Sequence, residues 1–190
     1  MSLLDLEEQY TFYASYHSNI VNKLVHIVFV PIILWSTFVF VSFTGVLFPK
    51  VQESLFQFVP TLAPIIPLNG AFLLALTYIC YYEILNAKAG VPASILVAAL
   101  LLLANLFVRS VPTQKAILLA LLLNVTGWAA QFVGHGVFEK RRPALLDNLI
   151  QAFATAPLFI VLEVLFPLGF QPELFRNIQK RLDSMKNKSH

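Results

Sequence analysis

Hydrophobic residues in this chain form long runs that are separated by short polar or proline-rich segments. Residues 27–48, 93–108 and 116–133 contain no charged side chain, and residues 68–85 contain one, Glu83. A membrane hydrocarbon core of about 30 Å is crossed by roughly 20 apolar residues in a helix. The four runs therefore predict four membrane-spanning helices.

A short turn is expected at NAKAGVP, residues 86–92, between the second and third runs. Three further segments complete the predicted fold. Apolar positions in residues 3–24 recur at roughly helical spacing, which predicts an amphipathic helix on the membrane or on the bundle. Residues 49–67 contain four prolines and are expected to form a loop. Residues 152–170 are apolar but interrupted by Pro157 and Pro167, so we expect them to re-enter or lie in the interface. The fold class is all-α, a polytopic membrane helix bundle of about four spans with an N-terminal amphipathic helix and a proline-broken fifth apolar segment.

Composition supports a single membrane-embedded domain, residues 1–175, followed by a basic polar tail, residues 176–190. Hydrophobic residues make up 58% of the chain and charged residues 12%, whereas soluble domains carry about 25% charged residues. The cations cluster at residues 140–142 and 176–188, which suits anionic lipid headgroups. Because Lys and Arg prefer cytoplasmic loops, both termini and residues 139–148 are expected in the cytosol. No basic segment is interleaved with stacking aromatic residues, so nucleic-acid binding is not expected.

Three histidines are predicted to meet at one membrane face. His26 stands near the start of the first span, His135 follows the fourth span, and His17 belongs to the leading helix. Four antiparallel spans place all three on the same side. Neutral imidazole is the commonest metal ligand in proteins, although interfacial histidines also occur simply as polar groups at a wet boundary. His190 ends the polar tail and is expected to have no role.

A shared metal site imposes a condition on the backbone. His17 and His26 are nine residues apart, which puts them on opposite sides of an unbroken helix. A bend near residues 19–23 would bring them together. The second nitrogen of a ligating imidazole usually bonds an amide or carboxylate. The amides expected in that role are Asn19, Asn22 and Gln131.

Two carboxylates are further candidates for the site. Glu139 follows His135 by four residues and is expected either to face the same metal or to pair with Arg142. Glu83 lies inside a span, where a charge is costly, and is a candidate for that reason. Cys80 is the only cysteine, which excludes a cysteine-built zinc cluster. Nitrogen donors without thiolates fit zinc or non-haem iron.

Two sequence blocks resemble a known family. FYASYHSNIVNKLVHIVFVP, residues 12–31, and GWAAQFVGHGVFEKRRPALLDNL, residues 127–149, are similar to the signature blocks of the Mpo-type family, the fungal 2-hydroxy fatty acid dioxygenases. The similarity covers nearly the whole chain apart from the tail. It implies an Fe(II)-dependent enzyme of the endoplasmic reticulum membrane that uses O₂ to shorten 2-hydroxy fatty acids, such as 2-hydroxypalmitate, by one carbon during phytosphingosine breakdown.

The resemblance also assigns roles to residues. It implies that His17, His26 and His135 are the essential, iron-binding residues, and that residues 1–175 are the catalytic domain. Arg141 and Arg142 lie where a fatty carboxylate would meet the membrane surface, and a guanidinium fork suits a carboxylate. Two other readings stay open: a lipid-binding or scaffolding membrane protein without activity, and a zinc-dependent membrane hydrolase that needs no oxygen.

Overall fold

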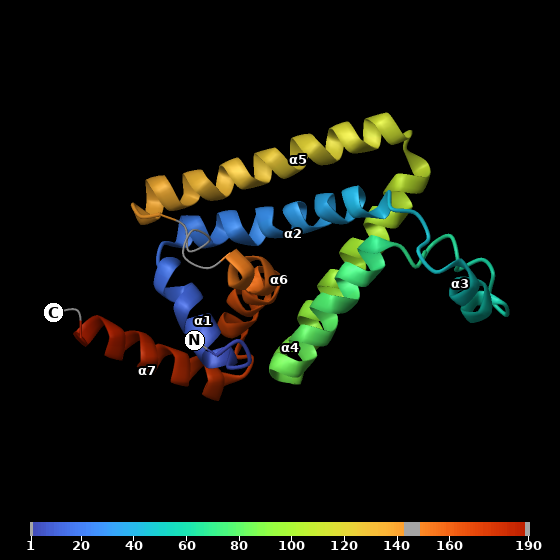
Figure 1. The fold of residues 1–190 in the computed structure, drawn as a ribbon. Helices are drawn as coiled ribbons and strands as arrows, with labels where there is room; N and C mark the ends of the chain where they lie inside the picture. Colours follow the sequence, from blue (N-terminus) through green and yellow to red (C-terminus); the bar gives the residue numbers. More distant parts are fainter. Residues whose placement is uncertain (1, 143–148, 189–190) are drawn as a thin grey trace.

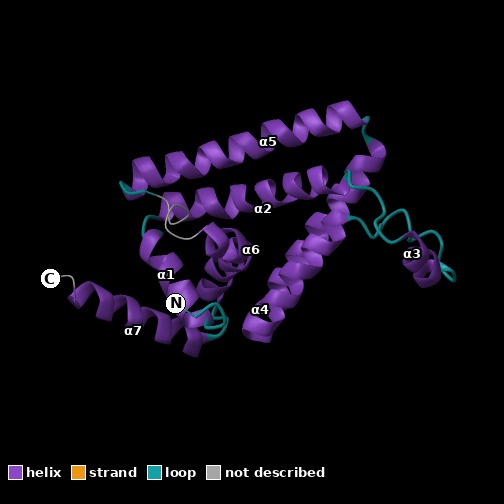
Figure 2. Ribbon diagram, in the orientation of Figure 1, coloured by secondary structure: helices purple, strands orange, loops and turns teal. Residues whose placement is uncertain are grey.

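The computed structural model describes residues 2–142 and 149–188, and regular structure in this part of the chain is entirely helical (Figures 1 and 2). The all-α prediction is confirmed. In chain order the elements are α1 (Leu6–Tyr16), α2 (Ile20–Ser42), α3 (Pro49–Phe56), α4 (Gly70–Ser110), α5 (Thr113–Val133), the π-helix η1 (Gly134–Glu139), α6 (Leu149–Leu165), the 3₁₀-helix η3 (Phe166–Leu168) and α7 (Pro172–Lys188).

Helix α2 is the centre of the bundle, because α4, α5 and α6 all pack against it (Figure 1). Helices α2 and α5 lie side by side and approach closely at Gly127, where an added Cβ would lie 2.6 Å from Cγ1 of Ile33. A larger residue at this position would push the two helices apart. The absence of a side chain therefore fixes the spacing on which the site between α2 and α5 depends.

The 41 residues of α4 form a hairpin rather than one rod. Asn86 leaves the helical conformation with φ −168° and ψ 105°, and its side chain accepts a hydrogen bond of 2.9 Å from the amide of Ala89. Ser94 Oγ donates to Glu83 at 3.0 Å, although residues eleven apart on a straight helix are separated by about 16 Å. At Gly90 an added Cβ would lie 2.7 Å from the Tyr82 carbonyl oxygen, so the two arms are in backbone contact.

This hairpin yields the predicted number of apolar segments. Three stretches of the described chain are long and apolar enough to cross a membrane: Ile20–Ser42, Gly70–Ser110 and Thr113–Glu139. Since the second of them folds back at Asn86, these three stretches of the described chain contain four apolar helical segments. The predicted turn over residues 86–92 is shorter than expected, because helical geometry resumes directly after Asn86.

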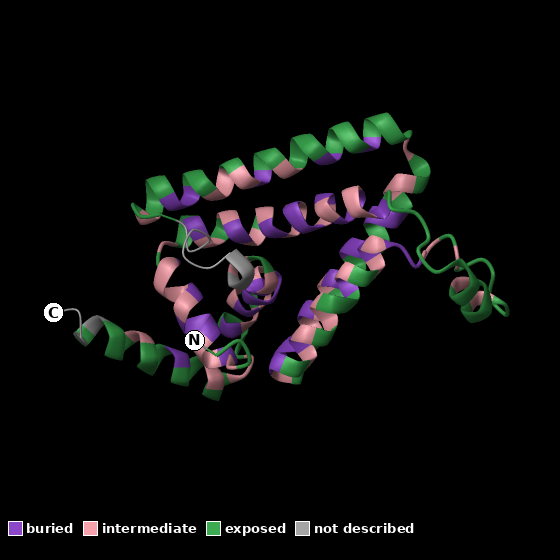
Figure 3. Ribbon diagram, viewed as in Figure 1, coloured by how far each residue is buried: buried purple, intermediate pink, exposed green. Residues whose placement is uncertain are grey.

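The outer face of α5 shows which solvent surrounds the bundle. Its exposed side, visible along the whole helix in Figure 3, consists largely of leucine and valine, including Leu118, Leu122 and Val125. Hydrocarbon accepts such a surface, and the helix satisfies its own backbone hydrogen bonds as a bilayer demands. The fold is that of a membrane protein.

The expected loop over residues 49–67 was wrong in part. Residues Pro49–Phe56 form α3, with Pro49 in the first turn, where the missing N–H of proline costs no hydrogen bond. The prolines at 60, 64 and 67 do lie outside any helix. Four prolines in nineteen residues suggested a continuous loop, but the first of them begins a helix.

The proline-broken fifth segment does not form one straight element. Residues Ala152–Leu168 and Pro172–Met185 make an angle of 107°, with Gly169 and Gln171 at positive φ in the bend. Helix α7 packs on α1, and its Ile178 is fully buried. The predicted tail of residues 176–190 is thus, as far as Lys188, part of a helix that begins at Pro172.

Candidate metal centre

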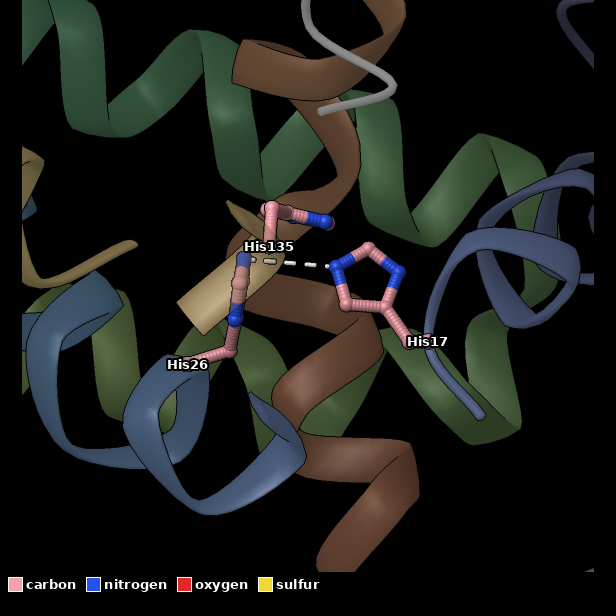
Figure 4. Close-up of side chains that lie close together, drawn as sticks. All are labelled: His17, His26 and His135. Carbon is pink, nitrogen blue, oxygen red and sulfur yellow. Dashed lines mark hydrogen bonds between the residues drawn. The ribbon is translucent and has the colours of Figure 1, made fainter. Parts of the chain in front are cut away.

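The three predicted histidines converge although they come from three different elements. His17 follows α1, His26 lies in the second turn of α2, and His135 lies in η1 at the end of α5. Each is at least 95% buried. Their imidazole rings point toward one another, with centroid separations of 4.5, 4.8 and 5.0 Å (Figure 4).

A break in the helix makes this convergence possible. Helix α1 ends at Tyr16 and α2 begins at Ile20, and the side chain of Asn19 caps α2 by accepting from the amide of Val21 at 2.8 Å. The required bend between His17 and His26 is therefore confirmed, but it lies just before the predicted residues 19–23.

Backbone carbonyls fix the tautomers of two of the imidazoles. His17 Nδ1 lies 2.7 Å from the carbonyl oxygen of Tyr13, and His26 Nδ1 lies 2.9 Å from that of Asn22. A carbonyl only accepts, so each Nδ1 carries the proton and each Nε2 of the neutral ring has a free lone pair. The two Nε2 atoms nevertheless face each other at 3.2 Å (Figure 4).

Two facing lone pairs need a positive charge between them. Protonation of His17 is opposed by burial, which holds the pKa of this imidazole well below its usual value of 6.5, and His26 acts in the same direction. His135 Nδ1 is buried as well and has no hydrogen-bond partner among the described residues. One nitrogen from each ring lies within 4.8 Å of the others, so the group is suited to hold a metal ion.

Glu139 is close to this group but not part of it. Its carboxylate accepts from Ser18 Oγ at 2.7 Å, from the Asn19 amide at 2.8 Å and from Asn22 Nδ2 at 3.2 Å. These bonds tie the end of α5 to the break that carries His17. The role of Glu139 in the structure is thus to join the segments that bear the three histidines.

The other expected amide contact is not formed. Gln131 lines the cavity beside His135, but no hydrogen bond joins its side chain to His135 Nδ1. Of the three predicted amides, only Asn22 supports an imidazole, and it does so through its backbone carbonyl rather than its side chain. The spacing of four residues was the correct signal, because it places a helical carbonyl below the ring.

The side chains of Glu83 and Arg141 form their bonds elsewhere, although the backbone amide of Arg141 donates to the His135 carbonyl at 3.4 Å. Glu83 is bonded to Ser94 within the α4 hairpin. Arg141 donates to the Ser15 carbonyl at 2.8 Å and lies 3.9 Å above the Tyr16 ring, while Arg142 is exposed. Neither arginine lines the cavity at the histidines.

An aromatic contact, an ion pair and a cavity surround the histidines. Tyr13 stacks on His17 with ring centroids 3.9 Å apart, and burial raises the pKa of its hydroxyl well above the usual value, with Glu163 adding to the shift. Lys23 and Glu163 form an ion pair of 3.0 Å between α2 and α6. A cavity of about 190 Å³ opens beside the imidazoles, between α2, α5 and α6.

Comparison with known proteins identifies the family of the chain. The family model described as 2-hydroxy-palmitic acid dioxygenase Mpo1-like matches residues 3–168, which include all three histidines. The chain belongs to the Mpo1-like family. It is 38% identical over 181 residues to the 2-hydroxy-palmitic acid dioxygenase MPO1 of Saccharomyces cerevisiae, an alignment that covers 95% of this chain and 91% of the yeast protein. The comparison with solved structures gives no match.

Proposed function

We propose that this member of the Mpo1-like family is a membrane-embedded dioxygenase that uses Fe²⁺ and O₂ to convert a 2-hydroxy fatty acid, such as 2-hydroxypalmitate, into the acid one carbon shorter. The reaction balances when one 2-hydroxy acid and one O₂ give the shortened acid, one CO₂ and one water. The observation that carries the proposal is the set of three buried imidazoles that converge beside a cavity in an apolar bundle, two of them with facing acceptor nitrogens.

Iron is the metal that best fits both the donors and the reaction. Three nitrogen donors without thiolates leave coordination positions open, and iron supplies the redox chemistry with O₂ that amino-acid side chains lack. His17, His26 and His135 would hold the ion. The Tyr13 and Asn22 carbonyls would keep the first two rings in the tautomer that presents Nε2 to it.

The surrounding chain provides orientation and excludes water. Tyr13 covers one face of the His17 ring, and Glu139 holds the three histidine-bearing segments together. Because each imidazole is buried, a substrate reaches the site through the cavity rather than directly from bulk water. A fatty acid dissolved in the bilayer suits such a route.

The substrate requirement tests this function. The bond to be cleaved joins the carboxyl carbon to the carbon that bears the hydroxyl group, so both groups are required at adjacent positions. Purified, iron-loaded protein should consume O₂ and release the shortened acid with 2-hydroxypalmitate, and be nearly inert with palmitate or 3-hydroxypalmitate. Equal turnover of palmitate and 2-hydroxypalmitate would overturn the assignment.

The proposed location is the endoplasmic reticulum membrane, with residues 1–175 as the catalytic domain and both termini in the cytosol. The pairing of the two terminal helices supports a common side, since Arg181 of α7 lies 3.1 Å from Glu7 of α1. Glycosylation acceptors placed at the N-terminus, near residue 147 and near Lys188 should stay unmodified, whereas one near Gln52 should be used. A glycosylated C-terminus would mean that α6 and α7 cross the membrane.

A further inference from the structure

The cavity beside the histidines is long, and two helices line it in the same way. On α2 it starts at His26 and ends at Thr37, and on α5 it starts at His135 and ends at Asn124. The two ends of each strip are eleven residues apart in the sequence. At 1.5 Å per residue the cavity follows the helices for about 16 Å.

Its walls between these ends are mainly apolar, with Tyr78, Gln131 and Thr155 as polar exceptions. Val30, Ile33 and Leu34 line it from α2, and Trp128 and Phe132 line it from α5. Helix α6 closes the third side with Phe153, Ala156, Pro157 and Phe159. A hydrocarbon chain satisfies such walls, whereas water does not.

The end away from the histidines is polar and already hydrogen-bonded. Asn124 Nδ2 donates to Ser36 Oγ at 2.9 Å, and it lies 3.4 Å from the Ile33 carbonyl oxygen and 3.5 Å from Thr37 Oγ1. A methyl group pushed past this point would separate a buried donor from its acceptors, which is costly because nothing in hydrocarbon replaces them. The pair Thr37 and Asn124 therefore acts as a floor.

The length of the cavity can be compared with a fatty acid. Carbon–carbon bonds of about 1.52 Å at angles near 111° advance an extended chain by about 1.25 Å per carbon, so about 16 Å holds roughly 13 carbons. When the carboxyl and hydroxyl groups are at the histidines, 2-hydroxypalmitate has about fourteen carbons left to place, close to this length.

We propose that this cavity is the binding site for the hydrocarbon tail of the substrate, and that Thr37 and Asn124 end it and set the longest chain that fits without displacement of the floor. The proposal rests on the proposed function for the position of the carboxyl end. Helices α2, α5 and α6 then form a groove that limits the chain length of the substrate, with the histidines at one end and the Asn124 amide at the other.

Photolabelling tests the orientation of the tail without any turnover. Two 2-hydroxy acids of sixteen carbons, one with a diazirine near the terminal methyl group and one with a diazirine at carbon 4, are bound under anaerobic conditions in nanodiscs, and labelled peptides are identified by mass spectrometry. The terminal probe should label the segments around Thr37 and Asn124, and the other probe those around Val30 and Phe132. Identical labelling by both probes, undiminished by excess 2-hydroxypalmitate, would overturn the proposal.

A side chain that blocks the groove about 6 Å from His26 tests whether the groove limits chain length. Val30→Trp should reduce turnover of 2-hydroxypalmitate at least tenfold more than turnover of 2-hydroxyhexanoate, whose tail ends before the block. The matched control is Val28→Trp on the same helix, which replaces a side chain that is 53% exposed and should leave the ratio unchanged. Ala156→Phe blocks the groove from α6 and makes the same prediction if Val30→Trp does not fold.

Two measurements distinguish failure of the groove proposal from failure of the proposed function: the metal content of the variants and the activity of the wild-type protein. Equal loss with both chain lengths in variants that keep their metal would show that the tail does not lie in the groove. A wild-type protein that consumes no O₂ with any 2-hydroxy acid would refute the proposed function instead, and the photolabelling result would still decide where a fatty acid lies.

Discussion

Two clusters of buried polar side chains lie toward opposite ends of α2, and they differ in how donors meet acceptors. At the C-terminal end, Asn105 Oδ1 accepts from Ser42 Oγ at 3.3 Å and from Asn69 Nδ2 at 3.4 Å, and Asn105 Nδ2 donates to the Ile65 carbonyl at 3.3 Å. At the N-terminal end, His17 and His26 turn acceptor nitrogens toward each other at 3.2 Å.

The difference separates a structural cluster from a binding site. Around Asn105 each donor has an acceptor, so the cluster joins α2, α4 and the segment before α4 and needs nothing further. At His17 and His26 the N–H donors have been used by the carbonyls of Tyr13 and Asn22, and two acceptor nitrogens are left facing each other. Buried acceptors without a donor are unfavourable, and a metal ion would relieve them.

The largest expected effect comes from removal of one imidazole. His17→Ala, His26→Ala and His135→Ala should each lower turnover of 2-hydroxypalmitate by well over 100-fold, since loss of a ligand exceeds the roughly 10- to 100-fold cost of losing a residue that supports a ligand. Helix content by circular dichroism should be unchanged. His190→Ala is the control and should be silent, and near-wild-type turnover in two of the three variants would refute a three-histidine site.

A smaller effect is expected at Glu139. Glu139→Ala removes the acceptor of three hydrogen bonds from Ser18, Asn19 and Asn22, so the three histidines should be held less firmly. We expect metal affinity to fall by about 10- to 100-fold, measured by competition with a chelator, with turnover recovering at high iron. Glu139→Gln retains one acceptor oxygen and should lie between Ala and the wild type. Loss of turnover that saturating iron does not restore would instead mean a direct part in the reaction.

The smallest effect on the site is expected from the other cluster. Asn105→Ala removes the partner of the Asn69 amide and of the Ile65 carbonyl, whereas Ser42 Oγ keeps the Phe38 carbonyl at 2.7 Å. This change should lower the free energy of unfolding by about 1 kcal/mol. Thermal unfolding in detergent should show the lower stability, while metal content and affinity match those of the wild type. A change in metal affinity would mean that the two ends of α2 are coupled.

Much of the fold was predictable because the membrane imposes it. Long uncharged runs predicted the spans, and the break at NAKAGVP predicted the hairpin at Asn86. Helix α3 was missed because its apolar residues are exposed, for example Leu55 at 63%, so that no buried periodicity marks it. The start of α2 was placed too late, since Asn22 and Lys23 are polar yet lie within the helix.

The site was predictable only to the extent that topology determines it. Antiparallel spans placed His17, His26 and His135 at one face without any knowledge of their contacts. Contacts that depend on tertiary packing were not predictable. Glu163 pairs with Lys23, 140 residues away in the sequence, and Asn124 contacts Thr37 on another helix. The contacts of Glu139 were likewise not predictable. Its spacing from His135 suggested a metal ligand, whereas in the structure it accepts hydrogen bonds from residues at and after the α1–α2 break.

The metal content of the protein tests the three-histidine metal site most directly. Wild-type protein and a His17→Ala/His26→Ala/His135→Ala variant are purified without oxygen, loaded with Fe²⁺ under identical conditions, freed of excess metal and analysed for metal by mass spectrometry. If the three histidines form the iron site, the wild-type protein should hold close to one iron per chain and the variant none, with equal helix content. The same iron content in both proteins would contradict it.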